Sequence, residues 1–155
     1  MNKPLHEVDF LRWTIAQAAA LRRAGTMRTH TPDPIDWEDV AEEIEALGRS
    51  ERAALRSRIA VILEHLFKLA VLPATDPRDG WQATLDTQRR EIGYLLADSP
   101  SLKREVAPMV ADEVSRVRRQ VIRAAARHGE ALAADPASIA FSAEQVLDED
   151  YPPVP

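Results

Sequence analysis

The stretch from Asp36 to Leu72 carries the longest unbroken helical pattern in the chain, and it constrains the fold more than any other feature. Apolar residues recur along it at the spacing that one face of an α-helix produces. Asp36 has the side chain of a helix N-cap, and Pro73 follows the last apolar residue. Gly48 would weaken such a helix unless close packing against another helix needs its missing side chain. The pattern predicts one long helix whose inward face is formed by Val40, Ile44, Leu47, Gly48, Leu55, Ile59, Ile62, Leu66 and Leu69.

Shorter helical patterns flank this stretch on both sides. Before it, Asp9 is expected to cap a helix that ends at Gly25 as its C′ residue, and a loop with two prolines is expected over 26–35. After it, Pro108 is interpreted as a helix boundary and Gly129 as a second C′ residue. The predicted helices on this side cover 81–97, 100–107, about 109–127 and 142–147, the last with a capping box of Ser142 and Gln145, before a tail over 148–155.

Composition supports an all-α fold, a bundle of four main helices in a single domain over 1–155. Cysteine is absent, which excludes disulfides, thiolate metal sites and cysteine nucleophiles. The most apolar window, 59–72, is too short for a membrane span and contains Glu64, His65 and Lys68. Because no secretory signal is recognised either, the expected location is the cytoplasm.

An ordered set of residues runs through the places where these helices are expected. Its members are Phe10 and Trp13, Asp36-Trp37-Glu38, Ala41 to Glu45, Leu47 to Arg52, His65 to Lys68, Trp81 with Thr84, Gln88 and Arg89, and Ser99 to Leu102. The set resembles a bacterial helical family catalogued as domain of unknown function twenty-nine, over roughly residues 5 to 150. The resemblance implies an all-helical single domain that a short helix near 141–150 closes. It implies no activity, because the family has no established function or catalytic residues.

Polar residues on apolar faces are the strongest pointer to a site. Glu51, Arg58 and His65 are spaced seven apart within the apolar arc of the long helix, and Gln17 and Gln88 occupy similar inward positions on two other helices. Buried charges are costly unless they are paired and hydrogen-bonded, so their presence needs a reason. One interpretation is structural: either a satisfied polar network that fixes helix register, or long side chains that reach water at the rim. The other is a pocket between helices for a small ligand or metal.

In that second interpretation, His65 would be a ligand or general base, Glu51 a ligand or orienting group, and Arg58 an anion clamp. A di-iron site is excluded, because no glutamate has a histidine three residues later. The sequence also contains no Gly-rich phosphate loop and no nucleophile motif. We therefore predict no bound cofactor and no catalytic residues.

Two charged runs are interpreted as solvated helix faces. The acidic run at the start of the long helix lies mostly opposite its apolar face, where acids interact well with the helix dipole. The late arginines could contact phosphates, but the chain has a net charge of -5 and no aromatic residues interleave with them, which argues against nucleic-acid binding. The acidic run is Glu38, Asp39, Glu42, Glu43 and Glu45, and the basic one is Arg116, Arg118, Arg119, Arg123 and Arg127.

Taken together, these patterns predict a non-enzymatic helical interaction protein. Its expected partner is a second copy or another protein, and the expected contact is one apolar helix face. The alternative is a bundle that binds a small molecule or metal around Glu51, Arg58 and His65.

Overall fold

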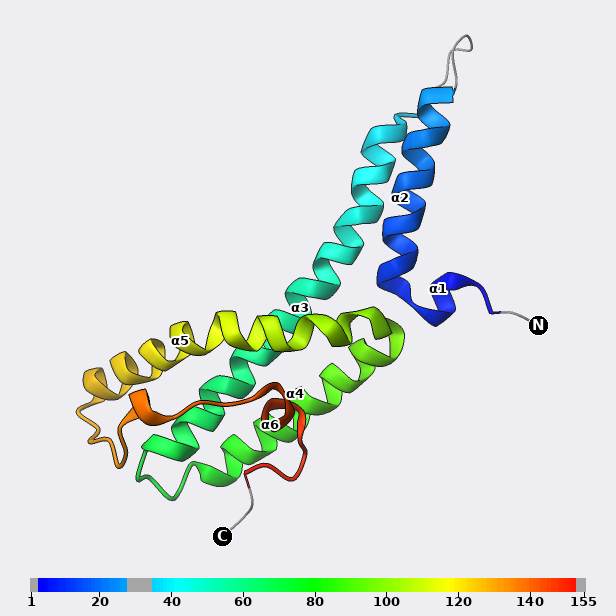
Figure 1. Cartoon of the computed structure of the whole chain (residues 1–155). Coiled ribbons are helices and arrows are strands. Elements are labelled where there is room, and N and C mark those ends of the chain that lie inside the picture. Colours follow the sequence, from blue (N-terminus) through cyan, green and yellow to red (C-terminus); the bar gives the residue numbers. More distant parts are fainter. Residues whose placement is uncertain (1–2, 28–34, 153–155) are drawn as a thin grey trace. The chain divides into compact units, whose positions relative to one another are not determined.

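The computed structural model describes residues 3–27 and 35–152, and in these ranges it is all-helical (Figure 1). Four long helices dominate, as the sequence predicted, and no strand occurs in either described range. None of the helices within them is long and apolar enough to cross a membrane. In chain order the elements are α1 (Leu5–Val8), α2 (Phe10–Met27), α3 (Trp37–Val71), α4 (Arg78–Asp98), the 3-10 turn η1 (Pro100–Leu102), α5 (Lys103–His128), the 3-10 turn η2 (Pro136–Ser138) and α6 (Ala143–Leu147).

Most helix ends lie where local chemistry predicted them. The Asp9 carboxylate accepts a hydrogen bond from the backbone N–H of Arg12 (3.0 Å), and Asp36 accepts from two N–H groups of the first turn of α3. Gly129 has a φ of 67° and ends α5, and the N–H of Glu130 then reaches back to the Ala125 carbonyl (2.9 Å). The capping box at the start of α6 is also present.

The predicted end of the first helix was wrong. Gly25 lies inside α2, which continues to Met27. A Cβ atom on Gly25 would lie 2.8 Å from Cβ of Trp37, so the glycine permits close approach of α3 and does not end the helix. The rest of the predicted loop, with Pro32 and Pro34, lies outside the described residues.

The predicted helix boundary at Pro108 was also wrong. After the η1 turn, α5 begins at Lys103 and runs through Pro108 without a break. A proline at this position forfeits one intrahelical bond, the one to the Arg104 carbonyl, and the Pro108 ring is exposed. Val106 and Met109 are buried on either side of it, so the apolar stripe of the helix stays continuous.

The chain separates into two compact units, and each unit draws on two segments. The first comprises the described residues up to Ala54 together with Leu95–Lys103. The second comprises Leu55–Tyr94 and the described residues from Arg104 onward. The single-domain organisation expected over 1–155 stays a prediction.

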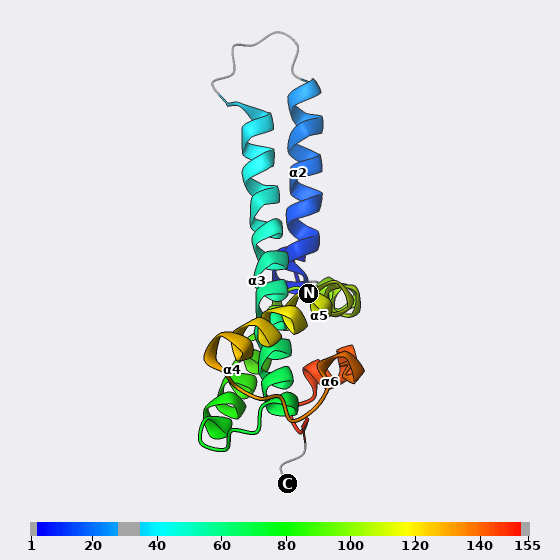
Figure 2. The same ribbon diagram turned by 90° about the vertical axis from the view of Figure 1, so that its left-hand side faces the viewer.

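In the first unit, α2 and the start of α3 lie side by side and antiparallel; we call this pair the hairpin (Figure 2). Its seam is formed by Leu11, Thr14 and Ala18 of α2 against Ala41 and Gly48 of α3, all of which are buried. Two residues predicted to face inward do not: Val40 is 40% exposed and Leu47 is 45% exposed. The reason is that a helix packed against one neighbour buries a narrow stripe, whereas the predicted arc is wide.

The second unit contains the larger core. Here four residues of the predicted inward face of α3 are confirmed, because Leu55, Ile59, Ile62 and Leu66 are at most 1% exposed, while Leu69 is half-buried. This part of α3 has neighbours on several sides, so a wide stripe is buried. The other buried apolar residues of the unit include Leu63, Phe67, Leu85, Ile92, Val110, Val117, Val121 and Val146.

Two arginines of the second unit bind the segment that follows α5. Arg89 is 4% exposed and donates to the carbonyls of Val146 (3.0 Å) and Gln145 (3.1 Å) in the last turn of α6. Arg118 donates to the Ile139 carbonyl (2.8 Å). The two Arg89 bonds supply donors to carbonyls that α6 cannot satisfy within its own single turn, whereas the Arg118 bond holds the residue that follows η2.

Candidate functional site

Of the polar residues predicted on apolar faces, Arg58 and Gln88 meet in the second unit. The Arg58 guanidinium donates from Nη1 to Oε1 of Gln88 (3.3 Å) and pairs through Nη2 with Oε2 of Glu91 (3.3 Å). Its Nε is buried and has no hydrogen-bond partner in the described part of the chain. The guanidinium therefore links α3 to one face of α4.

His65 lies two turns further along α3 and bonds within its own helix. Its Nδ1 is 2.8 Å from the Val61 carbonyl oxygen, which requires the proton on Nδ1 because a carbonyl can only accept. Seven residues of helix separate His65 from Arg58, or about 10 Å along the axis. His65 thus has a local structural partner of its own.

Glu51 belongs to the first unit. Burial of its carboxyl group raises the pKa of Glu51, the nearby Asp98 carboxylate raises it further, and a hydrogen bond with the Ser99 hydroxyl partly offsets the rise. Ser99 is fully buried, and its oxygen also accepts from the backbone N–H of Leu11 (3.1 Å). Glu51 is thereby tied to the base of the hairpin.

The inward position predicted for Gln17 was wrong, because its side chain is exposed. Helix α2 turns Ala18 and Thr14 toward α3, and Gln17 points about 100° away from Ala18. The structure therefore joins Arg58 with Gln88, while Glu51 and His65 have other partners and Gln17 faces solvent. Ligand binding by these five residues stays a prediction.

A buried acid that sequence reasoning missed is Glu113 of α5, which is 7% exposed. It accepts from Arg56 Nη1 (3.0 Å) and from Arg116 Nε (2.7 Å). Burial alone would raise the pKa of Glu113, but the bonds from Arg116 and Arg56 outweigh it and hold that pKa below its ordinary value. A permanently ionised acid between two arginines is a poor proton carrier, so this cluster is structural. The signal was present in the sequence, because Glu113 interrupts the valine stripe of α5.

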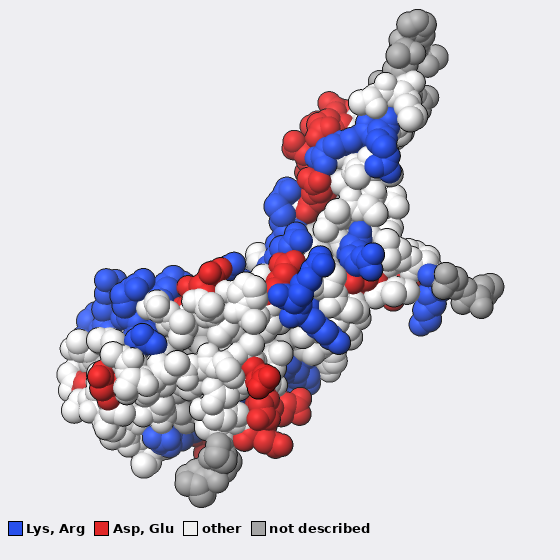
Figure 3. Space-filling view, viewed as in Figure 1, with Lys and Arg blue, Asp and Glu red and all other residues white. Residues whose placement is uncertain are grey.

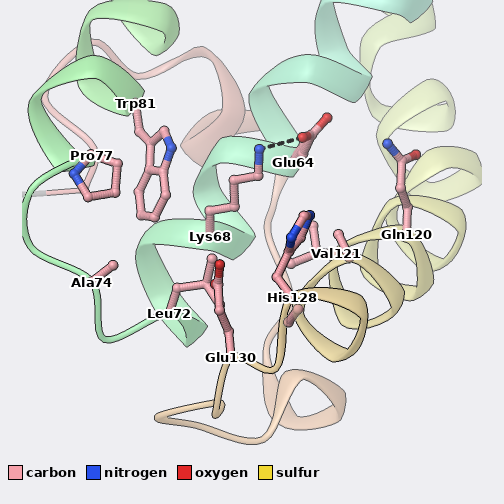
Figure 4. A pocket seen from close by; sticks show the side chains of 12 residues that line it. Glu64, Lys68, Leu72, Ala74, Pro77, Trp81, Gln120, Val121, His128 and Glu130 are labelled. Atoms are coloured by element: carbon pink, nitrogen blue, oxygen red, sulfur yellow. Dashed lines mark ion pairs between the residues drawn. The ribbon is translucent and has the colours of Figure 1, made fainter.

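No group of three or more His, Asp or Glu side chains that could hold a metal ion occurs in residues 3–27 and 35–152. The second unit does contain a cavity of about 270 Å³ between the ends of α3 and α5 and the start of α4 (Figure 4). It is lined by Glu64, Lys68, Leu72, Ala74, Pro77, Trp81, Gln120, Val121, Ala124, Ala125, His128 and Glu130.

The cavity has an apolar floor and a charged rim. Leu72, Val121 and Ala125 of the floor are buried. Lys68 pairs with Glu64 one turn earlier (2.6 Å), and both side chains are about three-quarters buried, with 25% and 27% exposed. In Figure 4 Trp81 stands on one side of Lys68 and His128 on the other. None of the five residues predicted as a site lines this cavity.

A second candidate site is the outer surface of the hairpin, whose two flanks differ in character. On one flank, Arg22 of α2 pairs with Glu38 (2.8 Å) and Glu45 (2.5 Å) of α3. The hydrogen bond from Arg22 holds the pKa of Glu45 below its ordinary value. Figure 3 shows Asp and Glu side chains gathered over this first half of α3.

The opposite flank is apolar. Because α2 and α3 are antiparallel, residues that lie on the other side of the seam from Arg22 and Glu45 share one face. On α3 the positions Val40, Ile44 and Leu47 of this face are apolar, and the next position of the same stripe is Glu51; on α2 the polar Gln17 lies among the apolar members. We call this surface the apolar flank, and its members are Phe10, Trp13, Leu21, Val40, Ile44 and Leu47.

Comparison with known proteins gives a family and a fold. The family model described as domain of unknown function DUF29 matches residues 5–152. A crystal structure of an alpha-helical protein of unknown function from Rhodospirillum rubrum is similar at 25% sequence identity and a TM-score of 0.73, covering 97% of this chain and 93% of that chain. A search of curated proteins found no match.

Proposed function

The chain belongs to the family described as domain of unknown function DUF29, and we propose that it is a non-enzymatic interaction protein that self-associates through the apolar flank of its hairpin. The observation that carries the proposal is the exposure of Val40 (40%) and Leu47 (45%) on a face of α3 that is apolar from Val40 to Leu47 and meets its first carboxylate at Glu51. Grouped exposed apolar side chains mark interaction surfaces, whereas isolated ones do not. A cytoplasmic location is part of the proposal, and the cysteine-free composition fits a reducing compartment.

A second copy of the chain is the occupant that fits this flank. A mainly apolar surface offers a strongly charged partner few groups to pair with, whereas an identical apolar flank is complementary to it under two-fold symmetry. Two hairpins joined in this way make a four-helix arrangement, the usual way in which paired helices bury a second face.

The available area supports a weak but specific dimer. Helix α2 has 18 residues, so the flank is about 27 Å long, and two helices side by side are about 20 Å wide. Each copy then contributes about 500 Å², and the total of about 1,000 Å² lies at the lower limit for a biological interface. A dissociation constant in the micromolar range is therefore expected.

The test is a comparison of oligomeric state between two charge variants. Val40→Glu combined with Leu47→Glu places two carboxylates in the centre of the flank, which would be buried without partners in a dimer. The matched control, Ser50→Glu with Ala53→Glu, adds the same charge to α3 at exposed positions away from the flank. Light scattering at about 50 μM should find a dimer for wild type and control but a monomer for the flank variant.

Circular dichroism must show the same helical content in all three proteins. A wild-type monomer at this concentration, or a flank variant that dimerises as well as the control, would contradict the proposal.

The second candidate function is ligand binding around Arg58 and His65 in the second unit. The observation in its favour is the unpartnered Nε of Arg58, a buried donor that a ligand or water could satisfy. Because Glu51 and His65 each have a separate partner, ligand binding is less well supported than self-association.

A further inference from the structure

We propose that the cavity between α3, α4 and α5 is a binding site for a small organic cation, an ammonium group carried on an apolar body. The apolar body would rest on Leu72, Val121 and Ala125, and the ammonium group would lie at the rim near Glu130 and Trp81. This site is independent of the hairpin and of the self-association proposed for it.

The volume of the cavity limits the size of the ligand. The cavity of about 270 Å³ lies just below the range of about 300–1,000 Å³ that is typical for drug-sized molecules. Its floor is made of aliphatic side chains that are almost completely buried, so an aliphatic or aromatic ring gains by displacing water from it. One ring with a short substituent is the size that fits.

Charge then selects among such molecules. The cavity is lined by two carboxylates, Glu64 and Glu130, and by one ammonium group, Lys68, so that with His128 neutral its formal charge is -1. Lys68 is neutralised by Glu64 at 2.6 Å. The remaining carboxylate is therefore that of Glu130.

The position of Glu130 is set by the helix end. Gly129 adopts its left-handed conformation (φ 67°), and the Glu130 N–H then bonds to the Ala125 carbonyl, which fixes the Glu130 backbone at the cavity rim. Trp81 adds an aromatic face, which attracts cations through its ring quadrupole. A carboxylate and an indole at the mouth of an apolar cavity favour an ammonium group over a neutral or acidic one.

The test uses three probes that share one ring and differ in charge: benzylamine, benzyl alcohol and benzoate. Trp81 is the only tryptophan of the second unit, so Trp13→Phe with Trp37→Phe makes it the sole tryptophan reporter. Thermal stabilisation of the unaltered full chain gives an independent readout. Benzylamine should bind saturably and about tenfold more tightly than benzyl alcohol, and benzoate should bind most weakly.

Charge variants make the direction of selectivity testable. Lys68→Met frees the Glu64 carboxylate and should tighten benzylamine binding several-fold. Glu64→Gln leaves the Lys68 ammonium without its partner and should move the preference toward benzoate. Glu130→Gln should reduce the advantage of benzylamine over benzyl alcohol, whereas Glu144→Gln, an exposed acid of α6 outside the cavity, should leave it unchanged.

A steric pair separates cavity binding from surface binding. Ala124→Leu fills the cavity and should abolish the response to all three probes, while Ala126→Leu, on the exposed side of the same helix, should preserve it. Circular dichroism verifies that both variants are folded. Equal affinity for the three probes, preference of the unaltered chain for benzoate, or no saturable binding up to about 10 mM would overturn the proposal.

Discussion

At the scale of single residues, Gly48 and Gly93 both lie inside helices but have opposite surroundings. A Cβ atom on Gly48 would lie 2.6 Å from Oγ1 of Thr14 and 3.0 Å from Cδ1 of Leu11, whereas one on Gly93 would have, among the described residues, no atom within 4 Å apart from its chain neighbours and the backbone of its own helix. Thr14 cannot move away cheaply, because it is fully buried and its hydroxyl donates to the Leu11 carbonyl (2.8 Å).

We therefore expect Gly48→Ala to lower the free energy of unfolding by about 1–3 kcal/mol, despite the better helix propensity of alanine. Gly93→Ala, its control, should raise that free energy by about 0.5–1 kcal/mol. Urea denaturation measures both. A Gly48→Ala variant as stable as wild type would show that the hairpin seam is looser than the structure indicates.

Glu51 gives a prediction about pH. Its pKa is raised in the folded state, so the folded protein binds this proton more tightly than the unfolded chain does. The stabilisation from that proton is full below the unfolded pKa of about 4.3 and is lost as pH rises through the higher folded pKa. Glu51→Gln, which resembles the protonated acid at every pH, should therefore gain stability relative to wild type between about pH 4 and pH 7.

The measurement is the free energy of unfolding of both proteins across that pH range. Glu43→Gln removes an exposed carboxylate of the same helix and reports the effect of net charge alone. If the difference between Glu51→Gln and wild type did not grow with pH beyond that seen for Glu43→Gln, the burial of the Glu51 carboxyl group near Asp98 would be contradicted.

Residue types alone did not show which face of a helix would pack against a neighbouring helix. Gly25 has the signature of a helix end, yet it serves close packing against Trp37. Gln17 fits an apolar stripe by spacing, but the seam of the hairpin lies on the neighbouring positions. In both cases the deciding fact is the location of another helix, which local sequence does not contain.

At the scale of elements, the short helix α6 depends on Arg89. Its guanidinium supplies hydrogen bonds to the Val146 and Gln145 carbonyls, and burial lowers the pKa of Arg89 although nearby acids oppose the effect. A single-turn helix of five residues is unstable by itself in water, so contacts of this kind hold it in place.

Arg89→Met keeps the length of the side chain but removes its donors. It should lower the free energy of unfolding by about 1.5–3 kcal/mol and accelerate hydrogen exchange of the α6 amides more than that of α4. Arg90→Met, at the exposed neighbouring position, should stay within about 0.5 kcal/mol of wild type. Unchanged exchange in the Arg89→Met variant would mean that other contacts hold α6.

Helix ends were predictable where a side chain bonds to the backbone next to it. Asp9, Asp36 and the capping box at Ser142 act in this way within three residues of their own position, and Gly129 ends α5 through its own left-handed backbone conformation. The predicted helix boundary at Pro108 was wrong, because burial of Val106 and Met109 offsets the one hydrogen bond that the proline forfeits. That burial depends on parts of the chain that are distant in sequence.

At the scale of the whole molecule, the all-helical class and the four long helices followed from periodicity. The two compact units did not, because their common boundary falls between Ala54 and Leu55 inside α3, where the apolar pattern continues unchanged. The cavity was not predicted either. In the sequence, its charged pair, Glu64 and Lys68, indicates only that the segment is too polar to span a membrane. The approach of α4 and α5 that forms the cavity is not encoded locally.

The base of the hairpin is closed by residues that are far apart in the chain. Asp9 accepts from the backbone N–H and the hydroxyl of Ser101 (both 2.9 Å), across 92 residues of sequence. On the ribosome, the hairpin helices are therefore synthesised long before the groups that cap their open end. Until Ser99 and Ser101 emerge, the nascent hairpin exposes Leu11 and the acids Asp9 and Glu51 without these partners, and chaperones or a second nascent chain have access to it throughout that interval.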